Sequence, residues 1–139
     1  MLVMLFTISI SINAQNNPEP WKAEQLITTE ALANAITHPS PHPPLIINIG
    51  PTGLIEGAVD IGSTNKKENL TRLEEVISNE PKDREIVLYC GCCPFKNCPN
   101  IRPAFTLLNT LKFTNGKLLD IPKNLKVDWI DHGYPMEKN

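Results

Sequence analysis

The sequence predicts one α/β domain in which a parallel sheet carries helices on both faces. Two largely apolar runs of strand length, Leu45–Ile49 and Glu85–Tyr89, are typical of strands that are buried on both sides. Amphipathic segments with helical spacing alternate with these runs, as the crossovers of a parallel sheet require. A chain of 139 residues with 41% apolar residues suits a single core.

The first half of the chain is expected to hold one helix and two strands. Residues 15–23 form an irregular lead-in, and Thr28 or Thr29 caps a helix that ends near His38. The proline-rich segment 39–44 is expected to be extended, because proline also disfavours helix at the residue before it. The strand Leu45–Ile49, a turn at 50–53 and a short strand at 58–61 follow.

The second half alternates helices and strands more regularly. Residues 65–79 place their leucine, valine and isoleucine side chains on one face, which predicts an amphipathic helix. After the strand Glu85–Tyr89 and a cysteine-rich loop, a helix begins near Ile101, and its first turn tolerates Pro103. A weak strand at 117–119 and a final helix at 123–131 complete the expected order.

The N-terminal segment predicts export. Residues 1–14 are apolar and uncharged, have the length of the apolar part of a signal peptide, and end at Ala14 before a polar stretch. We therefore expect a signal peptide at residues 1–14 and a protein of the bacterial periplasm, or a secreted one. The alternative, if the segment is not a signal, is the cytoplasm. The segment is too short to form a stable membrane anchor.

The charge balance argues against nucleic acid as a partner. The net charge is −2, the pI is about 5.9, and the sequence contains no basic stripe. The sequence does not identify a protein partner.

All four cysteines lie within nine residues, at Cys90, Cys92, Cys93 and Cys98. They follow a predicted strand and precede a predicted helix, so their side chains lie over the positive end of the helix dipole. Thiols in that position lose protons easily, and the thiolate is the form that attacks sulfur or carbon and binds metals. Structural disulfides explain the cluster poorly, because each would close a loop of only a few residues.

Five stretches, in their order and spacing, resemble the rhodanese-like (sulfurtransferase) domain family over residues 24–136. These stretches are Thr28–Ala33, Leu45–Ile49, Ile55–Ile61, Ile86–Cys90 and Asp128–Pro135. The resemblance implies a single rhodanese-like domain. The sequence departs from the family's pattern at Asn48 and Gly50, where the family has Asp and Arg, and in a longer loop with three extra cysteines.

The resemblance implies a thiosulfate sulfurtransferase-like enzyme or a carrier of sulfane sulfur. Cys90 would take a sulfur atom from a small anionic donor and pass it to a thiol acceptor, with Cys93 and Cys98 as alternative nucleophiles. The donor would be held by charged side chains and loop amides, with no cofactor. The residues expected in that role are Gly91, Cys92, Lys96 and Arg102.

Other chemistries remain open for the same loop. Cys90 and Cys93 have the C-x-x-C spacing of thiol redox pairs, which predicts a thiol–disulfide or redox-sensing protein of the cell envelope as the alternative. Four thiolates also suit a soft metal ion, with Cys90, Cys92, Cys93 and Cys98 as its ligands. A catalytically silent binding module is the remaining reading, because Asn48 and Gly50 replace the family's Asp and Arg.

Overall fold

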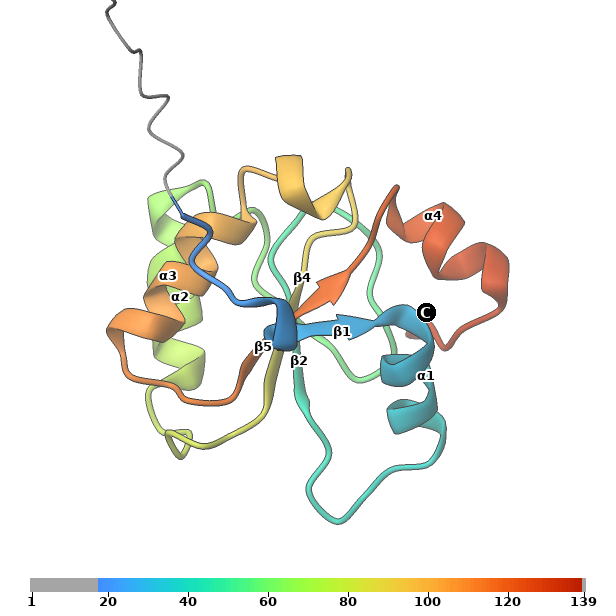
Figure 1. The fold of residues 1–139 in the computed structure, drawn as a ribbon, viewed down its shortest axis with the longest axis horizontal. Helices are drawn as coiled ribbons and strands as arrows, with labels where there is room; N and C mark the ends of the chain where they lie inside the picture. The colour runs from blue at the N-terminus through green and yellow to red at the C-terminus, as the bar shows by residue number, and fades with distance from the viewer. Residues whose placement is uncertain (1–17, 139) are drawn as a thin grey trace, which may run out of the picture.

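The computed structural model describes residues 18–138, which form a five-stranded parallel sheet between two layers of helices (Figure 1). The strand order is β1-β5-β4-β2-β3, with β4 in the centre. All four strand pairs are parallel. The strands are β1 (Leu26–Thr28), β2 (Leu45–Asn48), β3 (Val59–Asp60), β4 (Ile86–Tyr89) and β5 (Gly116–Asp120).

The helices cover both faces of the sheet, as the sequence predicts. Helices α2 (Lys67–Ile77) and α3 (Ile101–Thr110) lie together on one face, at the left of Figure 1. Helices α1 (Thr29–Thr37) and α4 (Leu125–Asp128) lie on the other. Three 3₁₀ turns accompany them: η1 (Ala23–Gln25), η2 (Phe95–Asn97) and η3 (Ile130–His132).

The central strand divides the core into two halves. Successive side chains of a strand point to opposite faces, so Ile86 and Leu88 enter the core under α2 and α3, while Val87 and Tyr89 enter the core under α1 and α4. Cys90 continues the alternation and packs on the side of Ile86 and Leu88. The strand therefore aims the first cysteine towards α2 and α3.

Two elements differ from the sequence prediction. Strand β1, which the sequence did not predict, pairs in parallel with β5 at the sheet edge, with Ile27 opposite Leu119. The final helix, predicted over 123–131, is the single turn α4 followed by η3. It begins where Asn124 accepts a hydrogen bond from the Val127 amide at 2.9 Å. It ends at Trp129, whose backbone leaves the helical conformation.

The lead-in carries an aromatic anchor into the core. Trp21 is only 8% exposed, and its ring lies 6.3 Å from that of Phe95 and 6.0 Å from that of Phe105. Because Phe95 belongs to η2, the lead-in packs against the cysteine loop as well as against α3.

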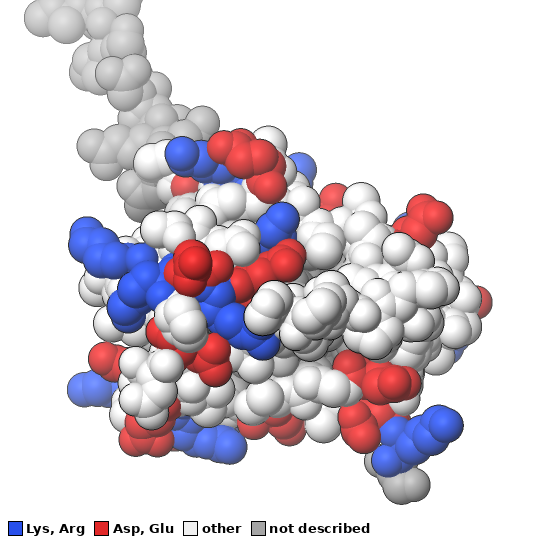
Figure 2. Space-filling model, turned by 90° about the horizontal axis from the view of Figure 1, so that it is seen from below, with Lys and Arg blue, Asp and Glu red and all other residues white. Residues whose placement is uncertain are grey.

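The surface and the termini give further context. Figure 2 shows basic and acidic side chains intermingled on the face seen from below. The signal peptide predicted at residues 1–14 lies outside the described residues. Among residues 18–138, no helix is long and apolar enough to cross a membrane.

Candidate functional site

Cys90 lies directly beyond β4, at the carboxyl end of the central strand. Ligands of open parallel sheets bind at this edge, outside the carboxyl ends of the strands. The backbone of β4 remains paired with the β2 segment up to Tyr89, because the amide of Ile49 donates to the carbonyl oxygen of Tyr89 at 2.9 Å. The sequence placed Cys90 at a strand end, and the structure agrees.

Gly50 allows the ends of β2 and β4 to approach each other. A Cβ atom at this position would lie 2.5 Å from the Cys90 sulfur and 2.7 Å from the Cys90 carbonyl oxygen. Real Cβ atoms do not make such contacts, so any side chain here would force the backbone apart. In this structure, position 50 therefore has no room for the arginine that the family has there.

Asn48 organises the turn beside the cysteine. This fully buried side chain accepts from the Gly50 amide at 3.1 Å and donates to the Thr52 carbonyl at 3.2 Å and to Asp60 Oδ1 at 3.2 Å. Thr52 in turn donates its hydroxyl to the Cys90 carbonyl at 2.6 Å. Hydrogen bonds thus link Asn48, which stands where the family has Asp, through Thr52 to the backbone of Cys90.

Gly91 bends the loop away from the strand. Its φ is +76°, in the left-handed region that glycine occupies without strain, and a Cβ there would lie 2.8 Å from Leu125 Cβ. Its carbonyl accepts from the Leu125 amide at 2.8 Å, which joins the loop to α4. The structure thus gives Gly91 a conformational role in the loop.

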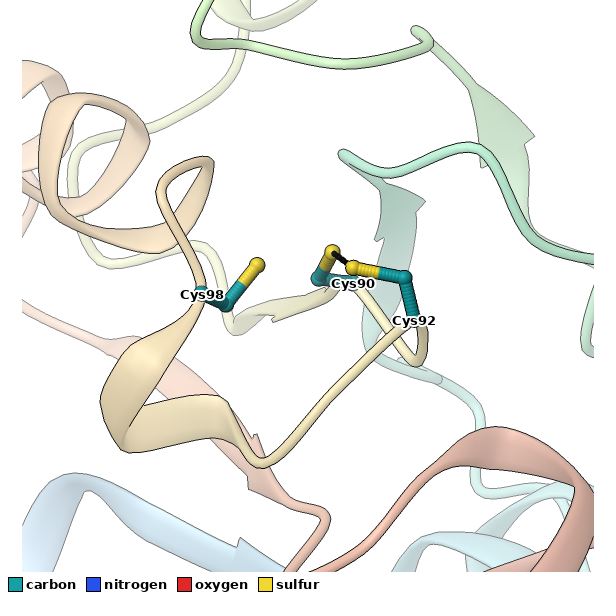
Figure 3. A group of neighbouring side chains, drawn as sticks. All are labelled: Cys90, Cys92 and Cys98. Atoms are coloured by element: carbon teal, nitrogen blue, oxygen red, sulfur yellow. Dashed lines mark hydrogen bonds between the residues drawn. The ribbon is translucent and has the colours of Figure 1, made fainter.

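The sulfur atoms of Cys90, Cys92 and Cys98 all lie within 4.8 Å of one another (Figure 3). The Cys90 and Cys92 sulfurs are 3.2 Å apart, and Cys93 joins from outside, 3.3 Å from Cys92. Cys90 and Cys98 are each 1% exposed, whereas Cys92 is exposed. All four are free thiols. We call Cys90, Cys92 and Cys98 the sulfur triangle.

The turn η2 brings Cys98 back to Cys90. Phe95, at the start of this turn, is buried and its amide donates to the Ile121 carbonyl at 3.1 Å, which holds the loop against the end of β5. The amide of Cys98 then donates to the Phe95 carbonyl at 3.2 Å and closes the turn. Figure 3 shows the Cys98 side chain pointing towards Cys90.

Asn100 is a site residue that the sequence analysis missed. It is 3% exposed, and its Nδ2 lies 3.3 Å from the Cys90 sulfur and 3.7 Å from the Cys98 sulfur. Its Oδ1 accepts from the Asn65 amide at 3.0 Å, and its carbonyl accepts from the Thr64 hydroxyl at 2.7 Å. An asparagine directly before a helix is normally interpreted as a cap, but this side chain makes no cap hydrogen bond and turns to the sulfurs instead.

The surroundings lower the pKa of Cys90 and raise those of its neighbours. The pKa of the Cys90 thiol falls to about 5, chiefly because the Cys98 thiol can donate to its sulfur, while burial works in the opposite direction. The Cys92 backbone amide and Asn100 add to the lowering of that pKa. Burial, together with its contact with Cys90, raises the pKa of Cys92 to about 12. The pKa of Cys98 is also raised, first by its interaction with Cys90. Of the three thiols in the sulfur triangle, Cys90 therefore ionises first.

The two predicted cations take different positions. Arg102 is bound by Glu19, with two nitrogen–oxygen distances of 2.7 Å, and its guanidinium lies 5.5 Å from the Trp21 ring centre. Lys96 is exposed, and its ammonium lies 6.0 Å from the Phe95 ring centre. Within residues 18–138, neither side chain has a hydrogen bond to a cysteine sulfur.

Replacing Asn100 by alanine is expected to slow alkylation of Cys90 about tenfold at a pH below its pKa of about 5. A hydrogen bond to a charged group contributes about 1.5 kcal/mol, so its loss raises the pKa of the Cys90 thiol by about one unit. Alkylation of the reduced protein followed by peptide mapping measures this rate. The matched control is Asn97→Ala, which changes an exposed asparagine of the same loop. Equal rates for Asn100→Ala and the unchanged protein would show that the amide does not stabilise the thiolate.

No family model matches the sequence, and no curated protein matches it significantly. Solved structures do match. The chain is similar to the rhodanese-like domain of the Anabaena sp. protein Alr3790, with 18% identity and a TM-score of 0.58 over 83% of this chain and 80% of that domain. It is similar to the single-domain sulfurtransferase RDL2 of Saccharomyces cerevisiae, with 16% identity and a TM-score of 0.57 over 81% of this chain and 93% of that chain.

A larger protein contains a similar unit. A cysteine-to-serine variant of EanB in complex with hercynine matches with 18% identity and a TM-score of 0.59, over 82% of this chain and 27% of that chain. This chain thus corresponds to about a quarter of the EanB chain.

The chain is a small α/β protein with a rhodanese-like fold, which confirms the fold class and the resemblance predicted from the sequence. Within this class it carries a loop in which three sulfur atoms meet at the end of the central strand.

Proposed function

We propose that the protein transfers sulfane sulfur through a persulfide on Cys90. One observation carries this proposal: the Cys90 sulfur lies at the carboxyl end of the central strand of a rhodanese-like fold, with the Asn100 amide 3.3 Å away. The lowered pKa of Cys90, about 5, supports the same assignment, because the thiolate is the attacking form. Cys93 and Cys98, the alternative nucleophiles, fit less well: Cys93 lies outside the sulfur triangle, and the pKa of Cys98 is raised.

The reaction has two steps. The Cys90 thiolate attacks the outer sulfur of an anionic donor such as thiosulfate; the donor's sulfur–sulfur bond breaks, and sulfite leaves with the electron pair. A thiolate acceptor or cyanide then attacks the outer sulfur of the Cys90 persulfide, and the Cys90 thiolate leaves. The first step oxidises Cys90 and the second restores it, so no further reductant is needed.

The donor is expected to approach past Cys92. Cys90 is 1% exposed, and the exposed Cys92 side chain lies 3.2 Å from it, so Cys92 must turn aside to admit a donor. The backbone amide of Cys92 already acts on the Cys90 sulfur and would stabilise a developing anion there. Exposed Lys96 is available to attract an anion, whereas Arg102 must first separate from Glu19.

Single-turnover sulfite release tests this proposal. The reduced protein is mixed with thiosulfate in the absence of an acceptor, and released sulfite is measured. We expect one sulfite per chain and a mass gain of one sulfur atom, reversed by cyanide. A protein that releases no sulfite and gains no mass would contradict the proposal.

The short distance between Cys90 and Cys92 favours a second candidate, a thiol–disulfide function. At 3.2 Å the two sulfurs are positioned to form a bond, so the structure favours Cys90 with Cys92 over the C-x-x-C pair that the sequence suggests. A peroxide would take two electrons and two protons from these thiols, giving a disulfide and water, and a thiol reductant would reopen it. The bridge would close a very short loop and would therefore be strained and easily reduced.

Mild peroxide is expected to produce a reversible Cys90–Cys92 disulfide, which peptide mapping under non-reducing conditions detects. Cys92→Ser should abolish this product, and Cys93→Ser should retain it. Four free thiols after peroxide treatment, or a disulfide that requires Cys93, would exclude this candidate.

Export remains part of the proposal, on the basis of residues 1–14 alone. Fractionation of cells that express the full chain tests it: mature protein shortened near Ala14 and found in the periplasm or medium would support export. Full-length protein in the cytoplasm would contradict it.

A further inference from the structure

The sulfur triangle has the size of a three-coordinate metal site. Its three sulfurs lie within 4.8 Å of one another, and the Cys90 and Cys92 sulfurs are 3.2 Å apart (Figure 3). Metal–thiolate bonds are about 2.3 Å long, so three thiolates in a plane around one ion lie about 4.0 Å apart. This value lies between the 3.2 Å from Cys90 to Cys92 and the 4.8 Å within which all three sulfurs lie. The exposed Cys92 side chain can move outward to equalise them.

The chemistry of the donors selects a soft ion. All three ligand atoms are sulfurs, and thiolates favour Cu(I) and Zn(II) over harder cations. Zinc in structural sites takes four ligands. Among residues 18–138, no histidine, aspartate or glutamate belongs to this cluster, and Cys93 lies outside it, with its sulfur 3.3 Å from that of Cys92. A three-sulfur set therefore suits Cu(I) better than Zn(II).

The residues around the triangle would stabilise cysteine thiolates that bind a metal ion. Asn100 donates towards both Cys90 and Cys98, at 3.3 and 3.7 Å, and such hydrogen bonds to ligand atoms orient them. Both of these cysteines are 1% exposed, so water cannot readily add as a further ligand on that side. Exposed Cys92 gives an arriving ion its first contact.

We infer that Cys90, Cys92 and Cys98 form a binding site for one Cu(I) ion. Binding releases the protons of the thiols that still carry them, and the ion keeps its oxidation state. A bound ion occupies Cys90, so it blocks attack by this sulfur on any donor. This inference extends beyond the proposed sulfur transfer and does not depend on it. Copper binding requires all three cysteines of the triangle, whereas sulfur transfer requires only Cys90 as the nucleophile.

Competition with a chromophoric Cu(I) chelator tests the inference. The reduced, metal-free full chain is titrated without oxygen, and we expect it to withdraw one equivalent of Cu(I) from the chelator. Cys98→Ser and Cys92→Ser should each lower the affinity at least about tenfold, since loss of even a supporting partner costs about 10- to 100-fold in metal affinity. Cys93→Ser is the matched control and should bind as the unchanged protein does.

A second measurement separates this geometry from other copper sites. X-ray absorption at the copper edge should find three sulfur neighbours at about 2.3 Å. Circular dichroism shows whether each variant is folded, and Cys92→Ser, at an exposed position, keeps the test valid if the buried Cys98→Ser does not fold.

The inference is overturned if no Cu(I) leaves the chelator, if Cys93→Ser weakens binding as much as Cys92→Ser, or if Zn(II) displaces bound Cu(I) at equal concentration. Sulfite release by metal-free protein reports sulfur transfer separately. A protein that binds copper without releasing sulfite would refute only the proposed function. One that releases sulfite without binding copper would refute only the metal site.

Discussion

Replacing Cys90 by serine is expected to reduce sulfur transfer from thiosulfate to cyanide at least about a thousandfold, because removal of a covalent nucleophile abolishes the intermediate on which both steps depend. A serine hydroxyl is not ionised near neutral pH, and it cannot hold sulfur as a persulfide. The substitution changes little else, because Cys90 is buried and serine, which is slightly smaller than cysteine, fits in the same space. Initial rates of thiocyanate formation measure the effect.

Cys93→Ser is the matched control for this prediction. It changes the neighbouring loop cysteine, whose sulfur lies 3.3 Å from that of Cys92 and which is not a member of the sulfur triangle. We expect this variant to keep transfer activity within about twofold, as for a partly exposed position away from the reacting atom. Full activity of the Cys90→Ser variant would contradict the assignment of Cys90 as the nucleophile. So would a loss of activity in Cys93→Ser without a loss in Cys90→Ser.

Gly50→Ala is expected to lower the free energy of unfolding by about 3 kcal/mol, because forcing a methyl group into a packed site costs up to that amount. The new Cβ would lie 2.5, 2.7 and 3.0 Å from the sulfur, carbonyl oxygen and Cα of Cys90. Two of these atoms belong to the backbone, so rotation of a side chain cannot relieve the clash. Urea unfolding measures the loss of stability, and thiosulfate assays of the folded fraction measure the displacement of Cys90.

Gly53→Ala is the control for added bulk in the same turn. Its Cβ would meet Met136 Cε at 3.2 Å, the end of a flexible side chain that can move aside. We expect its free energy of unfolding to change by less than about 1 kcal/mol. Similar losses for Gly50→Ala and Gly53→Ala would mean that the close approach to Cys90 is not what requires glycine at position 50.

The sequence predicted those strands well whose burial on both faces gives a continuous run of apolar residues. Strands β2 and β4 are buried on both faces, and their apolar runs identify them and their parallel arrangement. Strand β1 lacks such a pattern. It has three residues and an edge position, and it forms because β5 offers a pairing partner more than 85 residues later in the sequence.

The site was predictable only in part, for a similar reason. The position of Cys90 follows from local order, a strand followed by a loop. The triangle depends on η2, which returns Cys98 to Cys90 only because Phe95 is buried and held by Ile121. The ion pair between Arg102 and Glu19, 83 residues apart, likewise cannot be predicted from the neighbouring sequence. It engages a side chain that the sequence analysis expected to bind the substrate.

Asn100 could have been noticed, because a polar residue lies between the last cysteine and the helix. An asparagine at this place is normally interpreted as a helix cap, and that interpretation does not point to the sulfurs. What distinguishes it is burial with the amide directed at two sulfurs, and burial of a single polar side chain is a tertiary property that one sequence does not reveal.

Locating the transferred sulfur tests the central claim most directly. The reduced, metal-free protein is loaded with thiosulfate, alkylated rapidly and digested with trypsin, which cuts after Lys96 and so separates Cys98 from the other three cysteines. Fragment-ion mass spectrometry then assigns the additional sulfur atom within residues 85–96. The account predicts this atom on Cys90. An added sulfur on Cys93 or Cys98 with Cys90 unmodified, or no added sulfur at all, would contradict it.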